Sequence, residues 1–490
     1  MSAYYKSILK IKSLNIKNSL KISFSTRNSL PASNFKLKIE KLTLLTFLLI
    51  FAVSFLLFYP SLNYYFFQDD WFVLNWVRTG NLLSFFEFRT DIIYWRPLSM
   101  PLFFWLGRSL FDLNPRGFHT MALLFHFVNI LLIGHLSFLI FKNKKAKLIT
   151  MALYATASFH FMSLSWLSLT WNTIGFMFFI LSLILYLNFK KTRSIYNAIG
   201  TLALFLFALA SNEFAILFTA AVLTLDFIFN ERFNFSYFKN HLILILSIFI
   251  TAIYLVLRIF ISPIPSQGEY SIATDQRMLK NLLWYILWLF NLPEELKYQI
   301  VLSKLQITHI FWKAAKDFFP YILILLLINL LIIFRILTSI MSKKIFKLAI
   351  AAFLLLVIGL VPVLILPSHS FPYYLTISSF MVFIFLGHAF SLFMAKSKEK
   401  NAAILTSLVV VTWITSSWIT ISLNRKIHWI TAEQNLSREY VDLTKDKYPL
   451  LPFNLAIEIS DSNKQIIQSL MDQNAFQVIY NSDEVKTFYK

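Results

Sequence analysis

The sequence has no cysteine, few glycines and prolines, and far fewer acidic than basic residues. Because none of its 490 residues is cysteine, disulfide bonds and thiolate metal ligands are excluded. Only 9 glycines and 14 prolines are present, which is few for a transporter built from Gly- and Pro-broken membrane helices. Charged residues make up only 14% of the chain, and that share is too low for an ordinary soluble domain.

Apolar and aromatic residues dominate the sequence. Hydrophobic residues make up 58% and aromatic residues 18%, and the mean hydropathy is +0.65. These values predict an all-α polytopic membrane protein. The formal charge of +21 would suit a nucleic-acid partner, but the Lys and Arg residues lie in short clusters between apolar runs. That distribution indicates membrane topology, so we expect membrane lipids and no nucleic acid as partners.

The chain begins with a basic tail. Residues 1–41 contain many Lys residues and a single acid, Glu40, which predicts a poorly ordered cytoplasmic segment. The apolar run at residues 42–59 starts too far along the chain for an ordinary cleavable signal. We therefore interpret it as a retained first membrane span, from which the chain leaves on the extracytoplasmic side.

Further basic clusters fix the expected topology. They lie at residues 142–147, at 190–193, around Arg232 and Lys239, at 335–347 and at 396–400. If all of them face the cytoplasm, the spans between them must come in pairs. This condition divides residues 196–229 into two short helices that turn at 211–213. We then expect about eleven spans in the plasma (inner) membrane, with the N-terminus cytoplasmic and the C-terminus extracytoplasmic.

Three regions are expected outside the membrane. Two long extracytoplasmic loops cover about residues 60–116 and 262–319 of the membrane domain at 42–423. Their apolar stretches at 98–111 and 282–295 suit helices lying in the interface. Residues 424–490 have ordinary composition and predict a small α/β appendage. Within it, "FNLAIEIS" and "FQVIYN" suggest strands, and "NKQIIQSLMDQN" suggests a helix.

An acidic pair, Asp69 and Asp70, directly follows the first span. Acids in this position are often simply solvated, but the same loop also holds Arg96 in "YWRPL". One carboxylate can act as general base on an acceptor hydroxyl, while an arginine binds the oxygens of a leaving lipid phosphate. Asp69 and Arg96 would fill these roles, unless Arg96 merely reaches to the headgroups. Asp70 would hold the loop, position the acceptor or help a cation.

Other polar residues in apolar surroundings are further candidates. His119 and His126 lie seven residues apart on one helical face, although helix-packing histidines are more common than ligands. Glu213 lies in an apolar turn, where an acid is costly unless it is paired or functional. His369 is a weaker candidate in "PSHSFPYY". No further residues have the spacing of metal ligands, so we expect neither a metal nor another cofactor.

The order of several short motifs resembles a known class of enzymes. The motifs are "QDDW", "YWRPL", "NPRGFHTMALLFHFVNILL", "SWLSLTWNTIGFMFFILSLILYL", "ALASNEFAILF" and "HSFPYYLTISSFMVF", spread over about residues 42–423. In this order they are similar to the polytopic lipid-linked sugar transferases of the GT-C class. The nearest likeness is to the protein O-mannosyltransferase type, although no TPR repeats follow here. The resemblance implies a GT-C-like fold and hexosyltransferase activity.

The resemblance also implies residue roles. It places the catalytic base on Asp69, and it places Arg96 with Pro97 near the donor phosphate. The first-half histidines correspond to His119 and His126, and a Lys-Glu pair corresponds to Asn212 and Glu213, so the Lys is absent. Residues 372–374, Pro-Tyr-Tyr, stand where the resemblance implies an arginine before a late span.

The sequence thus favours an inverting glycosyltransferase. It would move a sugar from a polyprenyl-phosphate carrier to an acceptor hydroxyl of a protein, lipid or glycan on the extracytoplasmic face. A flippase or transporter for lipid-linked sugars would share the spans and the polar residues inside them. An O-antigen ligase or polymerase also handles polyprenyl-linked sugars, but its late outer loop is usually rich in Arg and His. A membrane scaffold would leave Asp69, Arg96 and Glu213 unexplained.

Overall fold

The structure is a computed structural model that describes residues 32–89, 92–229, 241–261, 268–301, 306–396, 399–450, 456–459 and 461–490. Most of the predicted basic tail, and the basic residues Arg232 and Lys239, lie outside the described residues. The chain divides into two compact units, Met1–Leu49 and Ile50–Lys490. Helix α2 (Ala32–Phe58) begins in the first unit and ends in the second. Every other described element belongs to the second unit.

Long apolar helices dominate the described part of the chain. Seven are long and apolar enough to cross a membrane. They comprise Thr43–Asn63 (α2 and η1), Pro115–Phe141 (α5), Leu167–Thr192 (η3 and α8), Leu242–Ile261 (α12), Phe319–Ile340 (α16), Lys343–Leu364 (α17) and Asn401–Ile427 (within α20, Glu399–Ile427). An eighth candidate is a pair bent by 67°, Pro372–Ser378 with α19 (Phe380–Lys396). The prediction of a helical multi-pass membrane protein is therefore confirmed.

Three shorter helices lie between these spans: α6 (Lys144–Ala155), α9 (Ile195–Leu209) and α10 (Leu217–Ile228). At 12, 15 and 12 residues and about 1.5 Å per residue, each is short for a hydrocarbon core of about 30 Å. The total of eleven spans thus stays a prediction. The predicted break at 211–213 is confirmed, because α9 ends at Leu209 and the 3₁₀ helix η4 (Glu213–Ile216) follows.

Short elements fill the connections. They are η1 (Tyr59–Asn63), α3 (Asp69–Thr79), η2 (Ser84–Phe86), α4 (Pro101–Phe111), α7 (His160–Ser165), η3 (Leu167–Leu169), η5 (Gly268–Tyr270), α13 (Gln276–Leu289), α14 (Leu296–Gln299), α15 (His309–Ala315), η6 (Pro372–Tyr374) and α18 (Leu375–Ser378), and η3 leads directly into the long helix α8 (Thr170–Thr192). Two strands, β1 (Ile300–Val301) and β2 (Gln306–Ile307), pair antiparallel. The two apolar stretches expected at the interface, 98–111 and 282–295, contain all of α4 and the second half of α13.

The C-terminal elements differ from the prediction at one point. They comprise α21 (Trp429–Lys447), β3 (Ala456–Ile459), α22 (Lys464–Leu470), α23 (Asn474–Ile479) and β4 (Lys486–Tyr489). The strand predicted at 476–481 is wrong, because residues 476–479 are the end of helix α23. Phe476, Gln477 and Val478 are all buried, so this segment lacks the alternating exposure of a strand. The parallel partner of β3 is β4 instead, with Ala456 opposite Lys486.

Local signals explain where several helices begin. Asn114 caps α5 by accepting a hydrogen bond from the Arg116 amide, and Pro115 occupies the first helical position. Asn143 likewise accepts from the amides of Lys145 and Ala146 at the start of α6. These caps let the chain leave one helix and enter the next within a few residues.

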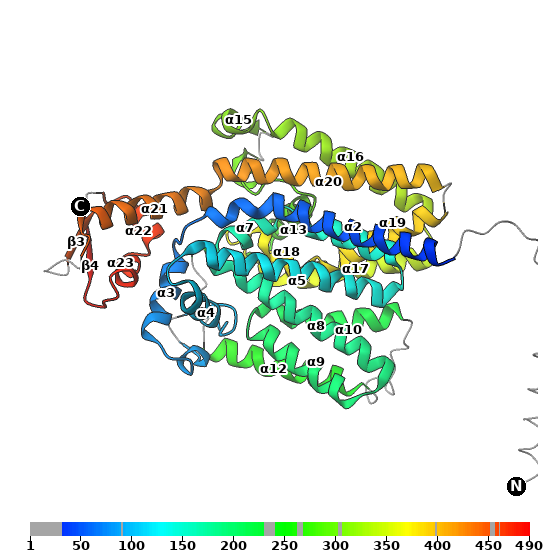
Figure 1. Cartoon of the computed structure of the whole chain (residues 1–490), viewed down its shortest axis with the longest axis horizontal. Helices are drawn as coiled ribbons and strands as arrows, with labels where there is room; N and C mark the ends of the chain where they lie inside the picture. The colour runs from blue at the N-terminus through cyan, green and yellow to red at the C-terminus, as the bar shows by residue number, and fades with distance from the viewer. Residues whose placement is uncertain are drawn as a thin grey trace, which may run out of the picture. The chain divides into compact units, whose positions relative to one another are not determined.

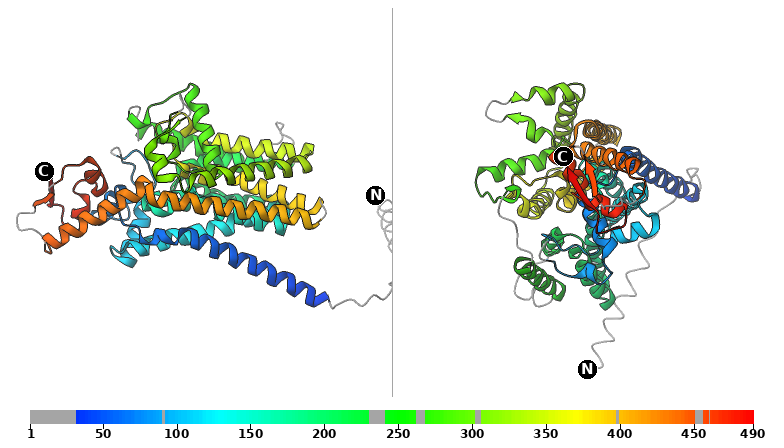
Figure 2. Two further views of the ribbon diagram at one scale, coloured as in Figure 1. Left: turned by 90° about the horizontal axis from the view of Figure 1, so that it is seen from above. Right: turned by 90° about the vertical axis from the view of Figure 1, so that its left-hand side faces the viewer.

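The helices pack lengthwise, as Figures 1 and 2 show for the second unit. Helix α8 packs on α5 and α9, α6 packs on α5 and α19, and α16 packs on α20. Basic connections meet at one end: the Asn143 side chain lies 3.3 Å from Ser391 Oγ, and Lys396 Nζ donates to the Ser339 carbonyl at 3.2 Å. The opposite ends carry the connections that hold Asp69, Arg96 and Glu213. Residues 143, 339 and 396, from three of the basic connections, thus lie at this end, and the pairing of all spans between basic clusters stays a prediction.

Candidate functional site

A cavity of about 380 Å³ lies among the connections at the end opposite the basic clusters. Its lining residues come from successive connections along the chain and from the ends of α12 and α17. They include Asp69, Tyr94, Arg96, Trp171, Glu213, Arg258, Tyr270, His369, Tyr373 and Tyr374. The volume lies within the range of small-molecule sites, and mostly apolar walls with a few polar groups are typical of such sites.

Asp69 is the first residue of α3 and contributes its carboxylate to the cavity. The side chain is half-buried, and it accepts no hydrogen bond from any residue that the structure describes. Burial raises the pKa of Asp69, while the nearby Arg96 guanidinium acts in the opposite direction. A carboxylate without a hydrogen-bond partner and with a raised pKa is a suitable proton acceptor for a bound hydroxyl group.

Asp70 points elsewhere. Its Oδ1 accepts hydrogen bonds from the amide and the hydroxyl of Ser168, at 2.7 and 2.6 Å, and its Oδ2 accepts from the Phe67 amide at 3.3 Å. The residue is fully buried and does not line the cavity. Burial raises the pKa of Asp70 to about 8, although these hydrogen bonds oppose the shift. Asp70 joins the start of α3 to η3, which matches the loop-holding role among those considered for it.

Arg96 forms a two-point ion pair with Glu213. Its Nε donates to Oε2 at 2.8 Å and its Nη2 donates to Oε1 at 2.5 Å. The guanidinium carbon also lies 3.7 Å from the ring centroid of Trp171 and 4.6 Å from that of Tyr94. Burial raises the pKa of Glu213, but the Arg96 charge and hydrogen bonds outweigh this effect and hold the pKa below its usual value. The pair is therefore ionised.

His369 lines the same cavity beside η5. Its Nδ1 lies 3.7 Å from Glu269 Oε2, and its ring stacks on Tyr270 with centroids 4.3 Å apart. Burial lowers the pKa of His369, and the Glu269 charge opposes this only in part. The imidazole is therefore neutral near pH 7 and offers a hydrogen-bonding group to a ligand in the cavity.

His119 and His126 do not line the cavity, although both lie on α5. The His119 ring is 3.0 Å from the Leu164 carbonyl, and the His126 ring contacts the hydroxyl of Ser54 and the carbonyl of Ala155. Both side chains are fully buried. The structure thus gathers Asp69, Arg96, Glu213 and His369 in one place and sets these two histidines apart in helix packing.

The two departures from the motif pattern have structural counterparts. Asn212, at the position of the absent Lys, accepts a hydrogen bond from the Phe214 amide and so caps η4. Tyr373 and Tyr374 occupy the region where an arginine was implied, and both line the cavity. The Tyr374 ring lies 4.9 Å from that of Phe214, on the wall next to Glu213.

Sequence reasoning missed several lining residues, of which Arg258 is the most informative. It lies near the end of the apolar helix α12, and its Nη2 donates to the Ile93 carbonyl. An ionisable residue inside an apolar run is a signal of function that could have found it. Trp171 and Tyr270 carried no comparable signal, because aromatic residues are common throughout this sequence.

The described residues contain no group of three or more His, Asp or Glu side chains arranged to hold a metal ion. The cavity instead combines one carboxylate, one ion pair, a second arginine and aromatic walls. No protein-family model matches this chain, and no curated protein sequence matches it.

Proposed function

We propose that this protein is an inverting membrane glycosyltransferase of the GT-C type. In this proposal it moves a sugar from a polyprenyl-phosphate carrier to an acceptor hydroxyl on the extracytoplasmic face of the plasma membrane. The observation that carries the proposal is the shared cavity, in which the Asp69 carboxylate faces the Arg96–Glu213 pair and Arg258. A base and two cations in one cavity suit a hydroxyl nucleophile and a phosphate leaving group.

The proposed reaction is a single displacement. Asp69 accepts the proton of the acceptor hydroxyl as its oxygen forms a bond to the anomeric carbon of the sugar. The bond between that carbon and the phosphate oxygen breaks, and the electron pair leaves with the phosphate. Because the leaving phosphate is already anionic, it needs cations rather than a proton donor. One displacement inverts the configuration at the anomeric carbon.

The arginines are suited to the carrier phosphate. Arg96 uses Nε and Nη2 for Glu213, and its Nη1 donates to no residue that the structure describes. The ion pair with Glu213 and the flanking Trp171 ring fix the plane of the guanidinium, so this remaining donor is already oriented. Arg258 adds a second positive charge on the cavity wall.

The walls of the cavity favour transfer over hydrolysis. Tyr94, Trp171, Tyr270 and Tyr374 surround the charged groups with aromatic surface. Apolar walls limit the number of water molecules near the reacting carbon, and the low local dielectric strengthens the attraction between arginine and phosphate. An acceptor hydroxyl bound next to Asp69 would therefore react in preference to water.

The proposal is tested by assaying the purified protein in lipid nanodiscs with a panel of radiolabelled polyprenyl-phosphate sugars. We expect one donor to be turned over, and Asp69→Asn to lower the transfer rate by about a hundredfold or more, as for a lost general base. Asp112→Asn is the matched control, because Asp112 is an exposed acid of the same loop outside the cavity. Binding of a donor without turnover by the wild type would instead favour a flippase.

A further inference from the structure

The backbone at the start of α3 is unusual. Gln68, the residue before Asp69, has φ 47° and ψ −124°, and its side chain does not cap the helix. A non-glycine residue in this conformation costs about 1–3 kcal/mol and persists only where its surroundings hold it. The position of Asp69 in the cavity therefore depends on what holds the Gln68–Asp69 corner.

Residues from the C-terminal elements hold this corner directly. The Gln68 amide donates to the carbonyl of Ser469, the last but one residue of α22, at 2.9 Å. Burial raises the pKa of the Glu433 carboxyl of α21 to about 7, and the nearby Gln68 side chain opposes this shift. Just before the corner, the Tyr65 amide donates to Gln434 at 3.1 Å. Both Ser469 and Glu433 are buried.

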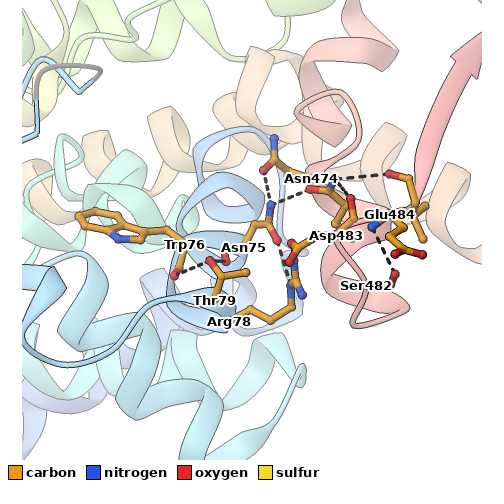
Figure 3. Close-up of polar contacts among 10 residues, drawn as sticks. Asn75, Trp76, Arg78, Thr79, Asn474, Ser482, Asp483 and Glu484 are labelled. Atoms are coloured by element: carbon orange, nitrogen blue, oxygen red, sulfur yellow. Dashed lines mark hydrogen bonds and ion pairs between the residues drawn. The ribbon is translucent and has the colours of Figure 1, made fainter.

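The contacts continue along one face of α3. The Trp71 indole N–H donates to Ser437 at 2.9 Å. Asn75 donates to Asn474 at 2.9 Å and to Gln477 at 2.8 Å, and Arg78 pairs with Asp483. Figure 3 shows Asn75 and Arg78 directed at Asn474 and Asp483.

The spacing shows that these contacts form a single surface. Gln68, Trp71, Asn75 and Arg78 are separated by three, four and three residues, so they fall on one stripe of the helix. Asp70 lies off this stripe and binds Ser168 of η3. Helix α3 is therefore held from two sides, and Asp69 lies between the two sets of contacts at its first turn.

We propose that the C-terminal clamp, defined as Gln434, Ser437, Ser469, Asn474, Gln477 and Asp483, sets the position of the Asp69 carboxylate in the cavity. Gln68 and Arg78 are then positioning residues, and the C-terminal elements are part of the site. The catalytic meaning of the clamp rests on the proposed function. The structural claim, that the clamp fixes the position of Asp69, does not depend on the proposed function.

The test exchanges the charges of the outermost pair. Asp483 is 69% exposed, whereas the Arg78 side chain is only 7% exposed. Because an exposed ion-pair partner contributes at most about 1 kcal/mol to stability, Asp483→Arg should fold, and the thermal unfolding midpoint of Arg78→Glu shows whether that variant is folded before its kinetics are compared. We expect either single variant to lower kcat by about tenfold or more with little change in the KM for the donor, because a misplaced base slows the reaction without weakening donor binding. The double variant should restore kcat. Arg116→Glu is the matched control, since Arg116 is an exposed arginine that bonds Asn63 and not the clamp.

A second measurement is independent of activity. Because the chain has no cysteine, Asp69→Cys provides a single thiol whose rate of modification by a maleimide reports its surroundings. We expect Arg78→Glu to change this rate several-fold, and Asp483→Arg added to it to restore the original rate. The proposal is overturned if the labelling rate is the same in all of these variants. If labelling responds as expected but wild-type protein transfers no sugar, the clamp stands and the proposed function fails.

Discussion

At the scale of single residues, two adjacent acids have different surroundings. Asp69 lines the cavity without a hydrogen-bond donor from the described residues, whereas Asp70 is buried and accepts three hydrogen bonds. The separation follows from the helix that begins at Asp69, because successive residues of a helix point about 100° apart. Asp70 thus serves the structure of the loop, while Asp69 stays available for the proposed chemistry.

The protonation of Asp70 should make stability depend on pH. Its pKa is about 8 in the folded protein, against an ordinary value near 3.8, so the folded state binds more protons between these two values. Stability should therefore be highest at low pH and fall towards pH 8, by at most about 1.4 kcal/mol per pH unit. Thermal unfolding of the detergent-solubilised protein should show a higher midpoint at pH 5 than at pH 8.5.

Asp70→Asn isolates this contribution, because asparagine does not titrate. We expect the variant to have a smaller difference in midpoint between the two pH values, while Asp112→Asn keeps the wild-type difference. An Asp70→Asn protein with the full wild-type pH dependence would show that other groups cause it.

At the scale of elements, the turn between α9 and α10 places Glu213 in the cavity. Asn212 caps this turn and packs against Gly175 of α8, where a Cβ would lie only 2.4 Å from the Asn212 Cβ. The close approach of the two backbones therefore requires glycine. This close contact positions the turn that carries Glu213 next to Arg96.

Gly175→Ala should displace the turn. We expect a loss of stability of about 1–3 kcal/mol from overpacking and a reduced transfer rate, because the ion pair of Glu213 with Arg96 would shift. Thermal unfolding and the donor assay measure the two effects. Gly200→Ala is a matched control in α9: its Cβ would meet only the end of the flexible Leu185 side chain. Equal behaviour of both variants would contradict the argument.

At the scale of the whole molecule, the basic connections and the cavity lie at opposite helix ends. The positive-inside rule then predicts that the cavity faces the extracytoplasmic side. The cysteine-free sequence permits a direct measurement with Lys145→Cys in a basic connection and Glu439→Cys on α21, both at exposed positions. A membrane-impermeant maleimide added to intact cells should label Glu439→Cys, and it should label Lys145→Cys only after permeabilisation. The reverse pattern would place the cavity in the cytoplasm.

The sequence alone determined features that depend on local composition. Long apolar runs can satisfy their backbone hydrogen bonds in a bilayer only as helices or as closed barrels, and the length of these runs indicated helices. The spacing of basic clusters required two helices in residues 196–229, with the turn that the structure contains. The same local reasoning failed at 476–481. A segment becomes a strand only if it pairs with another strand, and the segment that pairs with β3 is β4, which local composition could not reveal.

Only the tertiary structure decided which of the candidate residues meet. Arg96 and Glu213 are 117 residues apart, and Arg78 and Asp483 are 405 residues apart. In the structure, His119 and His126 lie outside the cavity, whereas Arg258, which the sequence analysis did not single out, lines it. Helix formation depends on neighbours three and four residues along the chain, whereas a site depends on how the helices pack together. For that physical reason, the sequence predicted the membrane helices and singled out Asp69 as a candidate, and the fold alone assembled the cavity around it.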